Sequence, residues 1–523
     1  MEERMGRSAA RLEDIPVLIH RIQLRLPVKE AARTSILSKS WSHAWSTIPI
    51  LKFHQAAQSL TKEQKTEHLE SVDRTLIRYL RDNIPIKRIF LKIDIKNKNS
   101  VDKWIQRLTT TITYPYKFSL IIVISGSTSL PDEILSGKNI INLNVSSSFS
   151  KIPSLLKTAH PVINCVSLRK LQLKCVQVNE KVLHDILSTC SLLVGIEVLY
   201  CKGLNNIKVK NLHRLRDLTV VLYEPNLYRL GIDSKTLEID DVPNLGFFKC
   251  RGIPLSFNDY SFRVTGLGLG DHLGMDYTYL DMIVLKFPLL RNLTLYLRSW
   301  ISESFHFTCA SMTTLSLMRC PKSLISVQIN APKLVYFWFE GTTMPSLVFP
   351  AVVNNSLLKR IQVEMSLSHP VDASFFLKMS QALALSIKCE IEITAMNMSV
   401  ILPPFDIDIE NLRKKVMYPA MNVQKLSFKT NGDEGMWDHS PFFDALFSIC
   451  HPKCVVAIPD EKYKHHNHFL KLMESKVVKK KKKRKDMEYL NWPYYLKSFE
   501  IKPETCRSLY GSALVSVFKL NWR

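Results

Sequence analysis

Apolar residues recur along most of the chain in groups of three at positions i, i+3 and i+5, and we call each group an apolar phrase. The last two apolar residues of a phrase alternate with other residues, which predicts a strand with one buried face, and the first packs behind that strand. The phrases lie beyond about residue 85 and are irregularly spaced. They are Leu168/Leu171/Leu173, Leu193/Ile196/Val198, Leu215/Leu218/Val220, Leu227/Leu230/Ile232, Leu290/Leu293/Leu295, Met312/Leu315/Leu317, Leu324/Val327/Ile329, Leu334/Phe337/Phe339 and Leu358/Ile361/Val363.

Two distant segments share a longer pattern. Residues 183–201 and 280–298 align so that apolar residues coincide at 183/280, 186/283, 187/284, 190/287, 192/289, 193/290, 196/293 and 198/295. Each segment predicts a short helix, a turn and a strand. Such units, roughly 20 to 29 residues long, are typical of a leucine-rich repeat, whose stacked copies form a curved solenoid with parallel strands on its concave face. A generic α/β protein with a parallel sheet is the alternative.

The first fifty residues predict three short helices. Apolar residues fall at helical intervals through residues 14–27, with Asp14 as the cap and Pro16 in the first turn. A second helix is expected at 28–37. Three helices of this length make a small core, so the unit is expected to need a neighbouring domain or a partner.

The third helix carries two tryptophans. Ser38 is expected to cap it, and Trp41 and Trp45 lie one turn apart on it. The tryptophans either fill the small core or anchor a partner, and their spacing alone leaves both open. Residues 52–84 predict a further helix with one apolar face, which together with the first helices can cap one end of the solenoid.

The N-terminal segment resembles a plant F-box. From Asp14 it reads DIPVLIHRIQLRLPVKEAARTSILSKSWSHAWSTIP, and it shows the family's Leu-Pro pair, Arg-Thr-Ser, Leu-Ser-Lys and both tryptophans. Val17-Leu18 replace the usual acidic pair, and Ser40 stands where a basic residue is common. The resemblance implies docking on the Skp adaptor of SCF-type ubiquitin ligases, which a cullin holds. The implied adaptor-binding residues are Ile15, Pro16, Ile22, Leu26, Pro27, Leu37, Ser38, Trp41 and Trp45.

The repeats resemble those of plant F-box/LRR proteins, many of which carry a C-terminal FBD module. Residues 494–506 (YYLKSFEIKPETC) resemble the opening strand of that module. We therefore expect an α + α/β chain in four parts. They are an F-box at 11–51, a helical linker or N-terminal cap at 52–84, an irregular leucine-rich-repeat solenoid with a parallel sheet at 85–430, and a C-terminal cap region at 431–523 that is FBD-like in part.

Charge narrows the choice of partners. The 523-residue chain has a formal net charge of +24, which favours acidic partners, and 46% hydrophobic residues, which is ample for a large core. Eight basic residues lie in the segment 476–485 (KVVKKKKKRK). Its densest run has the composition of a nuclear-import signal or a nucleic-acid patch, and a solvated loop is the third interpretation. The run consists of Lys479, Lys480, Lys481, Lys482, Lys483, Arg484 and Lys485.

The expected compartment is the nucleus, the cytoplasm or both. The N-terminus lacks the apolar stretch of a secretory signal, and the longest obvious apolar run, FSLIIVI, is far shorter than a membrane helix. The eleven cysteines follow no disulfide framework, which favours a reducing environment.

Three motifs suggest chemistry but do not meet its requirements. GLGLGDHLG (266–274) lacks the third glycine of a dinucleotide fingerprint, so a loop between repeats is expected. CHPKC (450–454), followed by His465, His466 and His468, has poor zinc-finger spacing. FDIDIE (405–410) is expected to form a strand with one wet face rather than a metal site. We expect no enzyme activity, no cofactor and no metal.

The sequence thus predicts a non-catalytic receptor in which the F-box docks on the ligase and the solenoid binds an unknown target protein. Lys170, Lys174, Lys208 and Lys210 flank predicted strands and favour an acidic or phosphorylated target. Neither a membrane nor a specific nucleic-acid ligand is expected. Two alternatives stay open: a basic nucleic-acid-associated protein, and a scaffold whose F-box-like segment only caps the solenoid.

Overall fold

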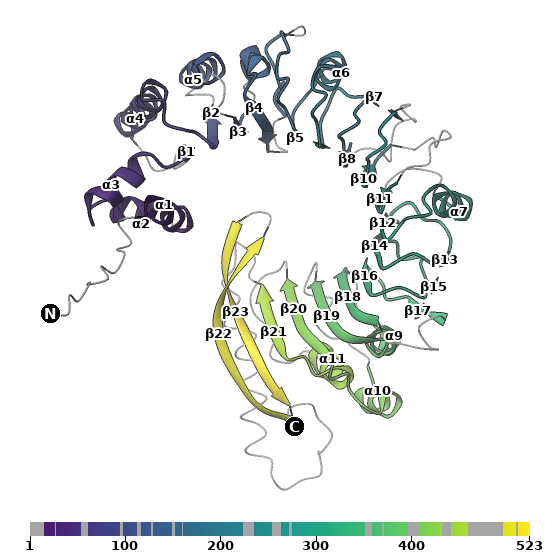
Figure 1. The fold of residues 1–523 in the computed structure, drawn as a ribbon. Helices are drawn as coiled ribbons and strands as arrows, with labels where there is room; N and C mark the ends of the chain where they lie inside the picture. The colour runs from purple at the N-terminus through teal and green to yellow at the C-terminus, as the bar shows by residue number, and fades with distance from the viewer. Residues whose placement is uncertain are drawn as a thin grey trace, which may run out of the picture. The chain divides into compact units, whose positions relative to one another are not determined.

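A computed structural model of the chain contains two compact units, Met1–Phe262 (unit 1) and Arg263–Arg523 (unit 2) (Figure 1). In each unit, short parallel strands form a sheet that helices cover on one face. The structure describes residues 15–26, 28–53, 61–94, 98–111, 117–126, 129–148, 152–158, 161–222, 235–253, 263–270, 275–350, 358–368, 371–395, 407–430, 441–458, 495–508 and 511–522.

Unit 1 opens with the three predicted helices. They are α1 (Pro16–Arg25), α2 (Val28–Thr34) and α3 (Lys39–Ser46). The N-cap of α1 is Ile15, which makes no side-chain capping bond, so the prediction of Asp14 as the cap is wrong; Asp14 itself lies outside the described residues. Pro16 occupies the first turn, where its missing N–H costs nothing. Ser38 caps α3 as predicted, because its hydroxyl accepts a hydrogen bond from the Trp41 N–H.

The sheet of unit 1 consists of parallel strands that pair in chain order. They are β1 (Ile50–Phe53), β2 (Arg88–Asp94), β3 (Phe118–Ser125), β4 (Ile140–Ser147), β5 (Lys170–Lys174), β6 (Gly195–Leu199), β8 (Asp217–Val221) and β10 (Phe247–Arg251). One face of this sheet is covered by α4 (Lys62–Arg81), α5 (Lys98–Thr111) and α6 (Glu180–Thr189), and η3 (Asp132–Ser136) packs against α5. A separate two-stranded sheet is formed by β7 (Asn206–Lys210) and β9 (Thr236–Asp240).

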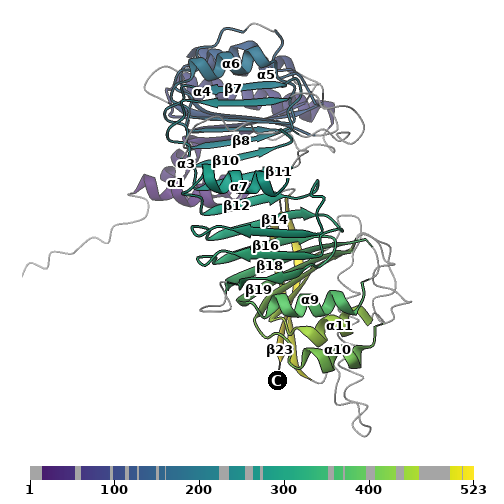
Figure 2. The same cartoon turned by 90° about the vertical axis from the view of Figure 1, so that its right-hand side faces the viewer.

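The sheet of unit 2 is also parallel over most of its width. Its parallel strands are β11 (Gly266–Gly270), β12 (Asn292–Tyr296), β14 (Thr314–Cys320), β16 (Tyr336–Gly341), β18 (Leu358–Leu367), β19 (Ser386–Ala395), β20 (Val423–Thr430) and β21 (Cys454–Ile458). An antiparallel hairpin of β22 (Leu496–Ser508) and β23 (Gly511–Trp522) extends it, because β23 pairs with β21. Figure 2 shows its helices in front of the strands: α7 (Tyr277–Lys286), α9 (Ala373–Leu383), α10 (Ile409–Val416) and α11 (Pro441–Ile449).

The apolar phrases form the core of both units, as predicted. All residues of the eight phrases that the structure describes are buried, the most exposed being Leu334 at 7%. The remaining phrase, Leu227/Leu230/Ile232, lies outside the described residues. In the two aligned segments α6 is followed by β6 and α7 by β12, which confirms the predicted helix, turn and strand. The fold is therefore a short all-α module followed by an irregular α/β leucine-rich-repeat solenoid.

One phrase belongs to a different sheet from its neighbours. Strand β15 (Ser326–Asn330), which contains Val327 and Ile329, pairs with β13 (Ser304–Thr308) and β17 (Ser346–Val348) in a separate three-stranded sheet. The strands before and after β15, which are β14 and β16, pair with each other in the main sheet. The apolar phrases follow one another closely in this part of the sequence because successive strands join two different sheets in turn.

Two expectations for the C-terminal part have different outcomes. The strand expected at 405–410 is wrong where the structure describes it, because Ile409 opens helix α10. The Asp408 carboxylate caps this helix by accepting a hydrogen bond from the Asn411 N–H at 3.0 Å. Such a cap contributes about 1 kcal/mol to the stability of the helix, which outweighs the strand preference of the few alternating residues. The strand implied at 494–506 is present, since β22 spans Leu496–Ser508.

Candidate interaction surfaces

The N-terminal helical module (residues 15–46) exposes an unusual number of large apolar side chains. We call this set the apolar surface of the module. It comprises Ile15 (41% exposed), Val17 (62%), Leu18 (37%), Leu24 (39%), Leu26 (36%), Ile36 (86%) and Leu37 (62%). Single exposed apolar residues are ordinary, but such a concentration in one small module is typical of an interaction site.

Three residues of this set were predicted to bind the adaptor, and that role stays a prediction. Ile15, Leu26 and Leu37 were predicted and are exposed. The sequence reasoning missed Ile36, although an isoleucine between the matched Arg-Thr-Ser and Leu-Ser-Lys elements was a usable signal. It also missed Val17 and Leu18, which replace the family's acidic pair and thereby add apolar area.

Trp41 lies inside the module. It is 9% exposed and packs with Ile19 and Ala44, and the partly buried Ile22 packs against this cluster. Trp41 and Ile22 can therefore support the apolar surface from behind, but Trp41 contributes little surface of its own. Trp45 is partly buried.

A buried glutamine joins the three helices. Gln23 of α1 is 1% exposed, and its amide nitrogen donates to the Thr34 hydroxyl of α2 at 3.0 Å and to the Trp41 carbonyl of α3 at 3.1 Å. These bonds fix the mutual positions of the helices that carry the apolar surface. The side chain of Pro16 and the whole of Pro27 lie outside the described residues.

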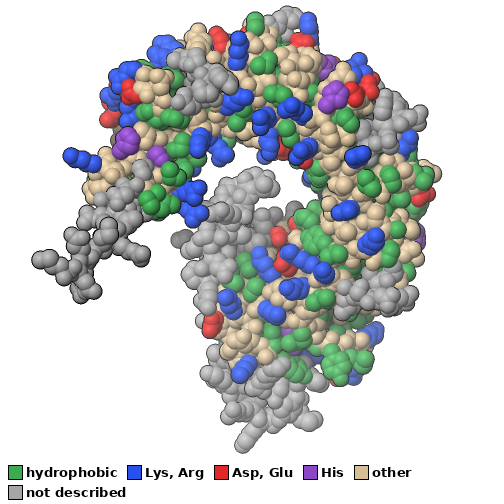
Figure 3. All heavy atoms as spheres, viewed as in Figure 1, with side chains coloured by type: hydrophobic (Ala, Val, Ile, Leu, Met, Phe, Trp, Pro, Cys, Tyr) green, Lys and Arg blue, Asp and Glu red, His purple; other side chains and the backbone are tan. Residues whose placement is uncertain are grey.

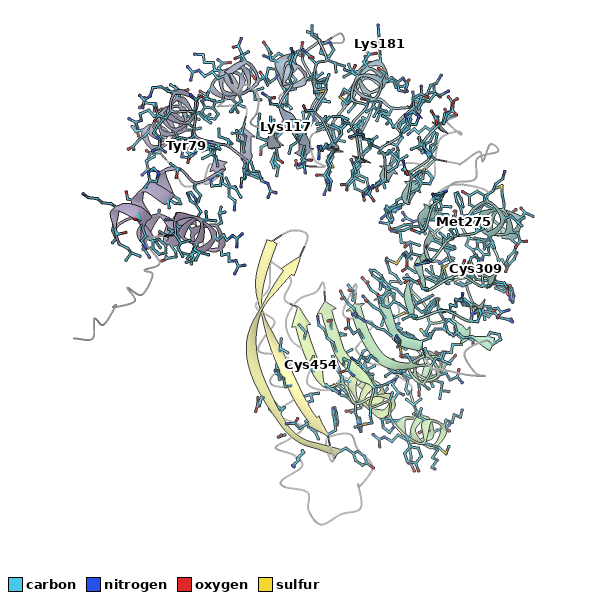
Figure 4. All side chains as sticks on the ribbon, in the orientation of Figure 1. Tyr79, Lys117, Lys181, Met275, Cys309 and Cys454 are labelled. Atoms are coloured by element: carbon cyan, nitrogen blue, oxygen red, sulfur yellow. The ribbon has the colours of Figure 1, made fainter. Side chains whose placement is uncertain are left out.

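The module is fastened to the first repeat of unit 1. Arg78 of α4 donates to the Ser46 carbonyl at 2.7 Å, and the Tyr79 hydroxyl donates to the Ile48 carbonyl at 3.0 Å. Burial raises the pKa of Tyr79 to about 12, so its hydroxyl remains a proton donor. Figure 4 labels Tyr79 at this joint, beside which lies a cavity of about 340 Å³ lined by residues such as Leu24 and Trp45.

The four lysines expected to flank predicted strands lie on two different sheets. Figure 1 shows helices on one face of the unit 1 sheet, and we call the opposite face the inner face. Lys170 and Lys174 of β5 are exposed and alternate with the buried Leu171 and Leu173, so they lie on the inner face. Lys208 and Lys210 belong to β7, and the Lys210 ammonium lies 2.5 Å from the Glu238 carboxylate of β9. All four lysines thus lie on strands, and the acidic or phosphorylated target that they favour stays a prediction. In Figure 3, Lys and Arg side chains gather along the inner face of unit 1.

Three glutamates stand side by side on the sheet of unit 2. Glu340 of β16, Glu364 of β18 and Glu392 of β19 occupy matched positions on neighbouring strands. Burial, together with the charges of Glu392 and Glu340, raises the pKa of Glu364 to about 7. A negative charge at Glu364 is therefore costly to the folded state.

The glycine-rich motif has a structural role. Gly266–Gly270 forms the buried strand β11, so the loop expected there is wrong for these residues. At Gly270 the backbone has a φ of +143°, and an added Cβ would lie 2.4 Å from the Tyr296 carbonyl oxygen. Glycine is required at this position by the close approach of β12.

The CHPKC motif is part of the C-terminal core. Cys450 is fully buried, and the His451 ring stacks on the Trp522 ring at 4.1 Å with an interplanar angle of 6°. Within the described ranges, the side chains form no group of three or more potential metal ligands. His465, His466 and His468 lie outside those ranges.

The basic run 479–485 also lies outside the described residues, so its three interpretations stay predictions. In the part of the chain that the structure describes, no helix has both the length and the apolar character needed to cross a membrane.

Comparisons with known proteins place these features in a family context. Residues 81–299 match the family model described as the At1g61320/AtMIF1 LRR domain. Three similar proteins of Arabidopsis thaliana are F-box/LRR-repeat protein At3g58930 (34% identical over 132 residues, 23% of this chain and 27% of that protein), F-box protein At5g03100 (24% over 276 residues, 51% and 78%) and F-box/FBD/LRR-repeat protein At1g13570 (23% over 250 residues, 46% and 53%).

The matched part of the chain spans 27% of the length of At3g58930, and 40% and 35% of the lengths of the putative F-box/LRR-repeat proteins At3g18150 and At3g28410 of Arabidopsis thaliana. The leucine-rich-repeat fold of the chain agrees with the repeats for which these relatives are named. By its repeats, its fold and these similarities, the chain is related to the plant F-box/LRR-repeat proteins.

Proposed function

We propose that the chain is a substrate receptor of an SCF-type ubiquitin ligase. The N-terminal module docks on a Skp-type adaptor, which a cullin holds, and the solenoid binds a target protein. The apolar surface of the module carries this proposal, because Ile36 is 86% and Leu37 62% exposed in a module too small to hide them. The receptor has no catalytic role; it raises the effective concentration of target lysines near the ubiquitin-carrying enzyme.

The energetics support docking through this surface. Full burial of an Ile or Leu side chain contributes about 1.5–3 kcal/mol, and a micromolar complex needs about 8 kcal/mol net. The most exposed apolar side chains of the module, Val17, Ile36 and Leu37, can therefore contribute much of the free energy that a stable interface needs. The proposed site of action is the nucleus, the cytoplasm or both, with the run 479–485 as the candidate import signal.

The test uses point variants of the full chain, because β1 already begins at Ile50 and a truncation would damage the first strand of the sheet. Ile36→Asp with Leu37→Asp is expected to lower co-purification with a plant Skp adaptor at least about thirtyfold. The matched control is Val162→Asp with Ile301→Asp, whose side chains are 73% and 91% exposed outside the module. The control is expected to co-purify like the wild type. Equal yields for both variants would refute the docking proposal.

A second measurement separates the receptor from its alternatives. Partners captured by the solenoid are followed after translation is blocked, in cells expressing the wild type or the Ile36/Leu37 variant. The receptor predicts longer half-lives and less ubiquitination of at least one captured partner with the variant. A scaffold predicts equal half-lives, and a nucleic-acid-associated protein predicts salt-sensitive DNA binding without any stabilised partner.

A further inference from the structure

Four basic side chains form a regular frame on the inner face of unit 1. Arg88 and Lys92 of β2 align in register with Lys170 and Lys174 of β5, across the intervening strands β3 and β4. Residues four positions apart along a strand are about 13 Å apart, and three strand spacings are about 14 Å. The four cations therefore mark the corners of a nearly square area, which we call the cationic frame.

Strand alternation orients all four side chains toward the inner face. The residues directly next to them along β2 and β5 are buried against the helical side of the sheet. These are Ile89 (0% exposed), Leu91 (1%), Leu171 (0%) and Leu173 (1%). Successive side chains of a strand point to opposite faces, so the frame residues project away from the core.

The floor of the frame is neutral and held in place. Asn142 donates to the Ser119 hydroxyl, and Asn144 donates to the Gln172 amide oxygen, each at 2.8 Å. The Gln172 amide nitrogen in turn donates to the Glu197 carboxylate at 2.7 Å, beyond the edge of the frame. These bonds link neighbouring strands and leave the floor without charge of its own.

Within the ranges that the structure describes, none of the four frame residues makes a side-chain hydrogen bond or an ion pair. Elsewhere the chain does neutralise its cations: Lys210 lies 2.5 Å from Glu238, and Arg360 lies 2.7 Å from Glu390. Four aligned cations that form no ion pair with a described carboxylate raise the local positive potential and attract an anionic partner.

We propose that the cationic frame binds an extended segment of the target protein with carboxylates four residues apart. An extended chain rises about 3.4 Å per residue, so the side chains of residues i and i+4 are about 13–14 Å apart and project from the same face. Both edges of the frame have this length. In an α-helix the same distance spans about nine residues, which places the two side chains on opposite sides. The inference rests on the proposed function and names the class of target segment.

A peptide fits the floor better than a nucleic acid does. Sites for single-stranded nucleic acid combine cations with aromatic side chains on which bases stack. The described floor between the frame residues offers Phe90, which is partly buried, and otherwise serine, asparagine, glutamine, isoleucine and valine side chains. Amide and hydroxyl groups of this kind suit the backbone and side chains of an extended peptide.

The test measures binding of fluorescent peptides of about twelve residues, rich in Ser and Thr, to the full chain at low salt. One peptide carries glutamate at every fourth position, and a second has the same composition with the glutamates adjacent. The first is expected to bind more tightly, and Lys170→Glu with Lys174→Glu is expected to weaken it at least about tenfold. The matched control is Lys103→Glu with Lys181→Glu on α5 and α6; Figure 4 labels Lys181 on the helical side.

Each outcome decides the proposal. Equal binding of both peptides, or equal losses in both variants, would show attraction by net charge alone and overturn it. Preference for a serine-phosphorylated peptide or for single-stranded DNA over the spaced glutamates would also overturn it. Adaptor co-purification of the Lys170/Lys174 variant is measured in parallel. If the Lys170/Lys174 variant still binds the adaptor but no longer binds the peptide, the result supports the frame. If the wild type does not bind the adaptor at all, the receptor role is refuted independently of the frame.

Discussion

Replacing Glu364 with glutamine should stabilise unit 2 at alkaline pH and leave its stability unchanged at acidic pH. Glu364 stands between Glu340 and Glu392 on neighbouring strands of the sheet. Burial and these two charges raise its pKa from an ordinary 4.5 to about 7, so the folded state favours the protonated, neutral side chain. Glutamine has the shape of that neutral form and carries no charge at any pH.

The size of the effect follows from the pKa. A rise from 4.5 to about 7 corresponds to about 3 kcal/mol. The side chain is only partly buried, and water screens its charge. We therefore expect the charge to lower the free energy of unfolding by about 1–2 kcal/mol. Because the folded pKa is raised, the wild type has its full stability below pH 4.5 and loses this contribution as pH rises to about 7. The advantage of Glu364→Gln should grow over that window and remain constant above it.

Urea unfolding of both proteins at pH 5 and pH 8 measures this difference. At pH 8 the variant should gain about 1–2 kcal/mol, and at pH 5, which lies just inside the titration window, about half of that. Glu390→Gln is the matched control, because the Glu390 carboxylate forms an ion pair with Arg360 at 2.7 Å. This variant should not be more stable than the wild type at either pH. A gain at Glu364 that is the same at both pH values, or a loss at pH 8, would contradict the role assigned to charge.

Two further predictions concern the C-terminal part. Burial lowers the pKa of His451 to about 4, so the folded state favours the neutral ring; stability is full above about pH 6.5 and should fall by about 2 kcal/mol as pH drops to about 4. His451→Phe, which keeps an aromatic ring beside Trp522, should flatten this dependence in urea titrations across that window. Changing residues 479–483 to glutamine should move a fluorescent fusion toward the cytoplasm. An unchanged distribution, together with no salt-sensitive binding of the wild type to duplex DNA, would leave only the solvated loop.

The core was predictable because its pattern is local. A strand with one buried face requires apolar side chains at alternate positions, so phrases such as Leu168/Leu171/Leu173 identify core residues without knowledge of their partners. The same pattern does not say which sheet a strand joins. Val327 and Ile329 look like Leu315 and Leu317 in sequence, yet β15 and β14 pair in different sheets. That choice depends on strands a repeat away.

The ends of helices and strands, and the choice of which apolar side chains stay exposed, were harder to predict because small differences in free energy decide them. At Asp408 one capping bond favours a helix over the strand that the alternating residues suggest. In the N-terminal module the sequence could not decide whether Trp41 is core or surface, since a tryptophan serves both purposes. Packing decides it: Trp41 meets Ile19 and Ala44, and the smaller Ile36 and Leu37 remain exposed instead.

The attachment of the module to unit 1 has a consequence for the proposed receptor. Helix α3 ends at Ser46 and strand β1 begins at Ile50, so hardly any chain separates the helices from the first strand of the sheet. The bonds from Arg78 to the Ser46 carbonyl and from Tyr79 to the Ile48 carbonyl hold this short connection. A tethered target samples a volume set by its linker, whereas a rigid joint fixes its distance and direction from the adaptor. In unit 1, therefore, the joint would carry the orientation of a docked adaptor directly to the cationic frame on β2 and β5.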